Sequence, residues 1–175
     1  MDHAELVGAI DGLPNAAWTG AAYRHVGGGR PPLSGEGARI VGGRWNPSGS
    51  YPVLYLGASR DVAVAEFRRL AVKQRVLPES FLPRTLYTYD IDVGSLLDLR
   101  PEAARATVGL TDRELLSDDL RPCQAVGEAA HACGREGIVV PGATGSGDVL
   151  AVFIGQVKPG SVVRDVHAEL WETVP

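Results

Sequence analysis

A glutamate, two arginines and a tyrosine stand in sequence contexts where their side chains can act on a charged ligand. Glu66 falls at the edge of the apolar face of a helix predicted over residues 59–72, so its carboxylate is expected to be half-buried. Such a carboxylate stabilises the positive charge that develops on a sugar when its glycosidic bond breaks. Arg24 and Arg44 have small or glycine-rich surroundings, and the guanidinium fork suits phosphate groups better than an ammonium does.

An aromatic residue and a hydroxyl-bearing loop complete the candidate residues. Tyr55 lies within a buried strand predicted over 52–57, where its ring can stack on a ligand and its hydroxyl can donate a hydrogen bond. Residues 142–147 (GATGSG) follow another predicted strand but lack the spacing of nucleotide-binding loops, and a strand follows them instead of a helix. Taken singly, each candidate is more often a solvated charge, a core residue or part of a turn, so only their joint pattern supports a site.

The elements that position these residues do not alternate regularly. We expect helices over 2–12, 59–72, 101–106, 111–118 and 122–133. We expect strands over 18–26, 52–57, 96–99, 138–140, 149–154 and 161–166, and a strand pair or one long bent strand over 81–93. Residues 27–50 read as a long irregular segment. Because strands outnumber helices, we predict an α+β fold with mixed or antiparallel sheets flanked by helices, not a doubly wound parallel sheet.

Composition and charge exclude several classes of protein. The 175 residues suit one domain over 1–175, with an N-terminal helix in 1–15 and a core over 16–167. A hydrophobic content of 45% excludes disorder, and no apolar run reaches the roughly 18 residues of a membrane span. The net charge of −4 argues against direct nucleic-acid binding. Cys123 and Cys133 share a predicted helix and are too far apart for a disulfide, which fits a reducing cytoplasm.

Four segments in this order resemble one known family, the RES-domain family, which is named after characteristic Arg, Glu and Ser residues. The segments are Trp18 with Tyr23-Arg24, residues 42–47 (GGRWNP), residues 54–56 (LYL) followed by Ala65-Glu66, and residues 137–141 (GIVVP) leading into 149–153 (VLAVF). The resemblance covers about residues 18–166. It implies an ADP-ribosyltransferase-like fold and a toxin of a bacterial toxin–antitoxin pair that consumes NAD.

The resemblance also implies roles for individual residues. Glu66 would be the catalytic carboxylate that assists cleavage of the nicotinamide–ribose bond, while Arg24, Arg44 and Tyr55 would bind NAD in a cleft between two sheet layers. NAD would be the substrate, with no cofactor and no metal. The family's serine normally follows the proline after the 138–140 strand, where this chain has Gly142. Either Ser146 or Thr144 supplies the hydroxyl, or it is absent; Ser146 is taken as the candidate NAD-binding residue.

Partners follow from the same resemblance. The family implies a cognate Xre-type antitoxin whose helix-turn-helix segment contacts DNA, with no membrane contact by this chain, in the bacterial cytoplasm. The chain would form a homodimer or a toxin–antitoxin hetero-oligomer. Phosphate, water and a protein side chain all remain open as the acceptor of ADP-ribose, corresponding to an NAD phosphorylase, an NAD glycohydrolase or an ADP-ribosyltransferase. Gly142 favours the alternative of a catalytically weak module that binds NAD, ADP-ribose or a protein.

Overall fold

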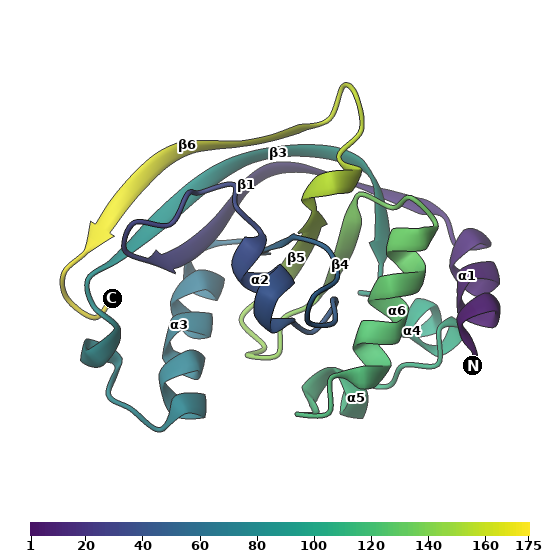
Figure 1. The fold of residues 1–175 in the computed structure, drawn as a ribbon, viewed down its shortest axis with the longest axis horizontal. Coiled ribbons are helices and arrows are strands. Elements are labelled where there is room, and N and C mark those ends of the chain that lie inside the picture. Colours follow the sequence, from purple (N-terminus) through teal and green to yellow (C-terminus); the bar gives the residue numbers. More distant parts are fainter.

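Six strands and six α-helices make up the fold in the computed structural model, which describes residues 1–175 (Figure 1). The strands are β1 (Asn15–Gly27), β2 (Val53–Gly57), β3 (Arg84–Asp98), β4 (Gly137–Pro141), β5 (Asp148–Phe153) and β6 (Val162–Trp171). The helices are α1 (His3–Asp11), α2 (Glu36–Val41), α3 (Arg60–Gln74), α4 (Glu102–Thr107), α5 (Asp112–Leu116) and α6 (Arg121–Ala132). Two short 3₁₀ helices follow α3 and β5, at Pro78–Phe81 and Ile154–Gln156. No helix has both the length and the apolar character that a membrane span requires.

Five of the strands form a closed ring. The pairings run from β1 to β2, β5, β4 and β3 and return from β3 to β1, while β6 pairs with β3 outside the ring. All pairs are antiparallel except β3 with β4. The link between β1 and β2 is a single residue pair, Tyr23 with Gly57. The ring is therefore weakest beside Arg24, and the sheet is mixed, as the sequence predicts.

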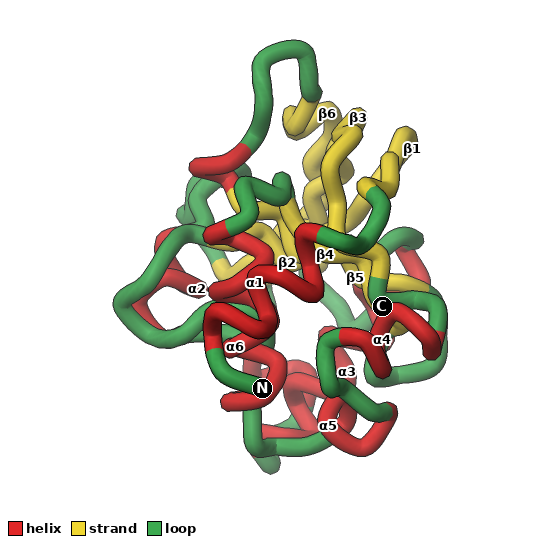
Figure 2. The backbone as a smooth tube through the Cα atoms, turned by 90° about the vertical axis from the view of Figure 1, so that its right-hand side faces the viewer, coloured by secondary structure: helices red, strands yellow, loops and turns green.

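The apolar side chains fall into three clusters that hold the layers together. One fills the inside of the ring with residues from all five of its strands, including Leu54, Tyr89 and Val152. A second packs α1 and α6 against the outer face of β2, β4 and β5. A third joins α3 to β3 and β6 through Phe67, Leu86 and Trp171. Long strands β1, β3 and β6 thus arch over the short strands, with the helices gathered on the opposite side (Figures 1 and 2).

Two features differ from the expectations based on sequence. Residues 84–98 form one strand, β3, so the short strand expected over 96–99 continues the one expected over 81–93. The Glu136 carboxylate accepts hydrogen bonds from Gly94 N and Ser95 N and bridges the polar interruption. The expected irregular segment 27–50 contains α2, whose Ala38 carbonyl accepts a hydrogen bond from Asn46 Nδ2 at 2.8 Å. The prediction that strands outnumber helices is therefore wrong, although the α+β class is confirmed.

Helix α3 forms where the sequence predicts it. Ser59 caps its first turn, because the side-chain oxygen accepts a hydrogen bond from Val62 N. Its buried residues Val62, Ala63, Phe67 and Ala71 recur at helical spacing and fix one face against the sheet. That packing fixes the direction in which the neighbouring residues of the helix point.

Candidate active site

A cavity of about 900 Å³ lies where β1, β2, α2, α3 and the end of β4 meet. Arg24, Arg44, Tyr55 and Glu66 all line it, although each comes from a different segment of the chain. The interior of the ring is filled by apolar side chains, so the cavity is not a cleft between sheet layers as expected. It lies instead beside the ring, between α2 and α3. Its volume falls within the range of small-molecule sites.

Glu66 projects from α3 toward this cavity. Its side chain is 32% exposed, which confirms the half-buried position predicted from the helical wheel. Oε2 of Glu66 lies 3.6 Å from Nη1 of Arg69, one turn further along the helix. The carboxylate receives no hydrogen bond, so both of its oxygens are available to a ligand.

Arg24 sits on β1 and contacts the loop that follows this strand. Its Nη1 donates to the carbonyls of Pro32 and Ser34 at 3.4 and 3.3 Å. The Tyr89 hydroxyl donates to the same Pro32 carbonyl at 2.6 Å. These contacts hold the glycine-rich loop against the long strands at one edge of the cavity.

Arg44 contacts the end of α5. Its Nη1 and Nη2 donate to the Ser117 carbonyl at 3.1 and 3.2 Å, and Nη1 also donates to the Glu114 carbonyl at 3.3 Å. Carbonyls at a helix C-terminus lack intrahelical donors, so a guanidinium group satisfies them well. These bonds orient Arg44 and place its positive charge at the cavity wall.

Tyr55 shapes the loop that carries Arg44. Its hydroxyl accepts a hydrogen bond from Trp45 N at 2.9 Å and donates one to Asn46 Oδ1 at 2.8 Å. A side chain at Gly43 would overlap the Tyr55 hydroxyl, so this turn requires glycine there. Burial raises the pKa of the Tyr55 hydroxyl, which keeps it protonated and able to donate.

The loop 142–147 divides between two places. Gly142 and Ala143 line the cavity, whereas Thr144 and Ser146 line a separate depression next to Arg60 and Arg68. The structure therefore does not bring Ser146 together with Arg24, Arg44, Tyr55 and Glu66. Gly142 N donates to Gly147 O at 2.8 Å, and a Cβ atom at position 142 would lie 2.5 Å from that carbonyl oxygen. A serine at 142 would thus require this loop to move.

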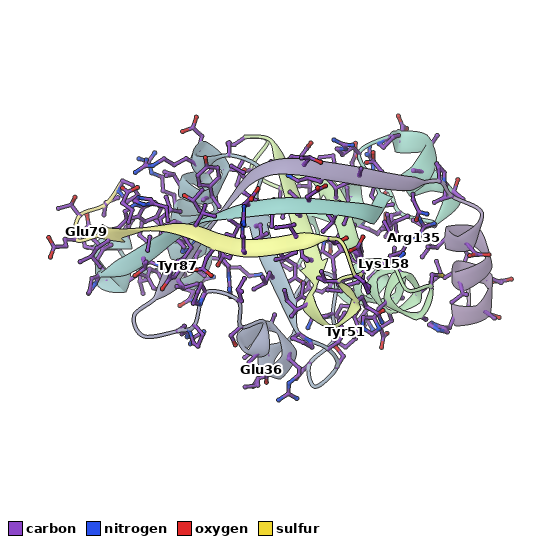
Figure 3. The ribbon with its side chains drawn as sticks, turned by 90° about the horizontal axis from the view of Figure 1, so that it is seen from above. Glu36, Tyr51, Glu79, Tyr87, Arg135 and Lys158 are labelled. Atoms are coloured by element: carbon purple, nitrogen blue, oxygen red, sulfur yellow. The ribbon has the colours of Figure 1, made fainter.

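Several residues of the cavity were not predicted from the sequence. Arg30, Arg69, His25 and Glu36 also line it, the last on α2 to one side of the long strands (Figure 3). Two local signals could have indicated the arginines: Arg30 follows three glycines, and Arg69 lies on the same face of the helix as Glu66. With four arginines and two glutamates, the cavity wall is positively charged even though the chain is acidic.

His25 differs from the arginines of the cavity because it is held by another side chain. Arg84 Nε donates to its Nδ1 at 2.9 Å, which leaves the ring proton on Nε2. Burial, together with the charges of Arg84 and Arg24, lowers the pKa of His25 to about 3. The imidazole is therefore neutral at physiological pH. No three His, Cys, Asp or Glu side chains gather closely enough to hold a metal ion.

The fold and this cavity agree with comparisons to known proteins. Residues 18–172 match the RES domain, so the chain belongs to the RES-domain family, as its motifs predict. It is similar to the NAD(+) phosphorylase MbcT of Mycobacterium bovis and of Mycobacterium tuberculosis, each 38% identical over 159 residues that cover 90% of this chain and 86% of the relative. It also resembles the crystal structure of the M. tuberculosis MbcT–MbcA toxin–antitoxin complex, with 35% identity, coverage of 95% and 92%, and a TM-score of 0.89.

Proposed function

We propose that this chain is an NAD-cleaving toxin that releases nicotinamide and transfers ADP-ribose to inorganic phosphate. The observation that carries this proposal is the meeting of a half-exposed carboxylate, Glu66, with four guanidinium groups in one cavity. Such a site suits a ligand that combines phosphates with a breaking glycosidic bond. The similarity to proteins named NAD(+) phosphorylase favours phosphate over water or a protein side chain as the acceptor.

The reaction follows from these groups. Nicotinamide leaves with the electron pair of the carbon–nitrogen bond, which neutralises its pyridinium nitrogen and leaves positive charge on the ribose. Glu66 stabilises this oxocarbenium character. An ionised oxygen of phosphate then bonds to the same carbon and gives the phosphorylated ADP-ribose. Because the attacking oxygen is already ionised, no general base has to remove a proton.

The remaining cavity residues bind and orient NAD. Arg24 and Arg44 hold the pyrophosphate, and the contacts of Arg44 with α5 pre-organise its guanidinium group. Tyr55 orders the turn beneath Arg44 and presents its ring to the ligand. The segment 27–43 acts as a lid over the dinucleotide, and Ser146 reaches NAD only after the loop 142–147 rearranges.

A second protein restrains this activity. The toxin–antitoxin complex formed by the related MbcT supports a cognate antitoxin for this chain. We expect an Xre-type partner that contacts DNA itself and covers the positively charged cavity, in a toxin–antitoxin hetero-oligomer. Expression of the chain alone in bacteria should stop growth and lower cellular NAD, and co-expression with the antitoxin should restore both.

Product analysis tests the reaction directly. The purified chain is incubated with NAD with and without phosphate, and the products are separated by chromatography and identified by phosphorus magnetic resonance. We expect nicotinamide and phosphorylated ADP-ribose to appear together. Both should form at a useful rate only when phosphate is present. Free ADP-ribose in both samples would instead identify hydrolysis.

A binding module without useful catalysis is the second candidate, because Gly142 replaces the family serine and Ser146 lies outside the cavity. This alternative predicts that the chain binds NAD but releases no nicotinamide from it.

A further inference from the structure

The four arginines of the cavity differ in how their hydrogen-bond donors are used. Arg24 and Arg44 donate to backbone carbonyls, which fixes their positions. Arg30 and Arg69 line the same cavity and make no hydrogen bond within the protein. A guanidinium group has five donors, so these two keep donors that a ligand can use.

Arg69 is the one of the two that lies beside the catalytic carboxylate. Its Nη1 is 3.6 Å from Glu66 Oε2, close enough for an ion pair but longer than a hydrogen bond, and its side chain is 36% exposed. The other basic residues of α3 are engaged outside the cavity: Arg60 with Glu169, Arg68 with the Pro175 carbonyl and Lys73 with Asp118. Arg69 is thus the cation of α3 that is free to act next to Glu66.

Phosphorolysis places a specific demand on this position. A doubly charged phosphate must approach the ribose carbon on which positive charge develops, and that carbon lies next to the Glu66 carboxylate. Two anions repel each other at such short range in a partly buried site. A cation that contacts the carboxylate and also has free donors reduces this repulsion and can hold two phosphate oxygens through its fork.

Water as the acceptor makes a different demand. It needs no cation, but it must lose a proton as it attacks. Glu36 is paired with Arg39 at 2.7 Å, and the neutral His25 accepts its only available hydrogen bond from Arg84. The cavity therefore offers an incoming anion a free cation but offers water no free base other than Glu66 itself.

From this arrangement we infer that Arg69 binds the inorganic phosphate that accepts ADP-ribose and so determines the preference for phosphate over water. The inference rests on the proposed function of the same cavity and names the residue that selects the second substrate. Arg30 lies near Arg24 and Arg84, so we assign it, with Arg24 and Arg44, to the pyrophosphate of NAD.

Steady-state kinetics with both substrates varied tests the inference. Nicotinamide release is measured for the wild type, Arg69→Gln, Arg69→Lys and the matched control Arg68→Gln. Arg68 is the preceding residue on the helix and points away from the cavity. For Arg69→Gln we expect KM for phosphate to rise about 10- to 100-fold, the effect of losing hydrogen bonds to a charged group. KM for NAD should change much less, and the product should shift from phosphorylated toward free ADP-ribose. Arg69→Lys should recover part of the phosphate affinity, and Arg68→Gln should match the wild type.

The outcomes separate the inference from the function on which it rests. If the wild type releases no nicotinamide in phosphate, both are wrong. If the wild type is a phosphorylase and Arg69→Gln keeps its phosphate KM and product ratio, only the role of Arg69 is wrong. An equal rise of both KM values would also overturn it, because Arg69 would then bind NAD. Circular dichroism of each variant confirms that the fold is retained.

Discussion

The cavity and the far end of the long strands use buried charge in opposite ways. At the far end, Arg135 and Glu136 form an anchor cluster with Asn15 and Ser95, and Arg135 lies close to the segment of Lys158 (Figure 3). Arg135 is 5% exposed and Glu136 is 1% exposed. In the cavity, by contrast, Glu66 keeps 32% of its side chain exposed.

Hydrogen bonding shows the same difference. The Glu136 carboxylate accepts from Gly94 N and Ser95 N through one oxygen and from Lys158 N through the other, at 2.9–3.1 Å. Arg135 Nη2 donates to the carbonyls of Ile10 and Leu13 and thereby ties α1 to the core. Glu66 receives no comparable bond. In the anchor cluster, the charged groups have all their hydrogen-bond partners within the protein and stabilise the fold. In the cavity, the Glu66 carboxylate lacks such partners and is available for substrate.

Glu66→Gln should show the largest difference between an effect on activity and an effect on stability. Loss of the charge should lower NAD turnover by at least about 100-fold, the scale of one pre-organised electrostatic group. The free energy of unfolding should change by less than about 0.5 kcal/mol, because this partly exposed side chain carries no hydrogen bond. Nicotinamide release and urea denaturation measure the two effects. More than about a tenth of wild-type turnover would remove Glu66 from the chemistry.

Arg44→Ala should weaken NAD binding by about 2–3 kcal/mol, because charge-assisted hydrogen bonds to the pyrophosphate are lost. Titration calorimetry with the Glu66→Gln background prevents turnover during the measurement. Arg164→Ala serves as the control, since that exposed arginine on β6 is paired with Asp90 and does not line the cavity. Unchanged affinity would mean that Arg44 only secures the end of α5.

Glu136→Gln should destabilise the fold by about 2 kcal/mol, since an amide group would turn a donor toward a backbone N–H that now donates to a carboxylate oxygen. Turnover per folded molecule should stay close to that of the wild type, the reverse of the result for Glu66→Gln. The midpoint and slope of urea denaturation measure the loss. A variant as stable as the wild type would show that the anchor cluster does not support the fold.

Acid should weaken the anchor cluster selectively. Burial alone would raise the pKa of Glu136, but hydrogen bonds from Lys158 N, the Ser161 side chain, Gly94 N and Ser95 N outweigh it, and the pKa lies below its usual value. The ionised carboxylate thus stabilises the fold above its unfolded-state pKa of about 4.3, and this contribution is lost as the pH falls through the folded-state pKa. We expect the stability gap between wild type and Glu136→Gln to narrow from pH 7 to pH 3. A constant gap would contradict this assignment.

Ser146→Ala should have the smallest effect. Its hydroxyl is exposed and outside the cavity, so it contributes to NAD binding only through a rearranged loop. We expect a loss in turnover of about threefold, near the low end for one neutral hydrogen bond. Thr144→Val is the companion variant. Full activity of both would mean that this loop supplies no hydroxyl to the reaction.

Local rules explain why much of the fold could be predicted. The Ser59 cap, the apolar spacing of α3 and the end of α6 at Gly134, which has φ of 67°, depend on neighbours within a few residues. The continuation of β3 through residues 94–98 was missed, because Gly94 and Ser95 look like a break unless their bonds to Glu136, more than 40 residues away, are known. For the same reason, the sequence does not reveal that Glu136 stabilises the fold.

By itself, the sequence determined the α+β class and the RES-domain family. It also predicted four candidate site residues, Arg24, Arg44, Tyr55 and Glu66, because their types and spacing follow a recognisable pattern. Only the tertiary structure decided that these four line a cavity beside the ring, that Ser146 lies elsewhere and that Arg69 stands next to Glu66 with its donors free. A charged group is either hydrogen-bonded within the protein or available to a ligand, depending on partners that can be far away in the sequence. Ser117, for example, is 73 residues from Arg44. Helical and strand periodicities are set by adjacent residues, whereas such partners are set by how distant segments pack.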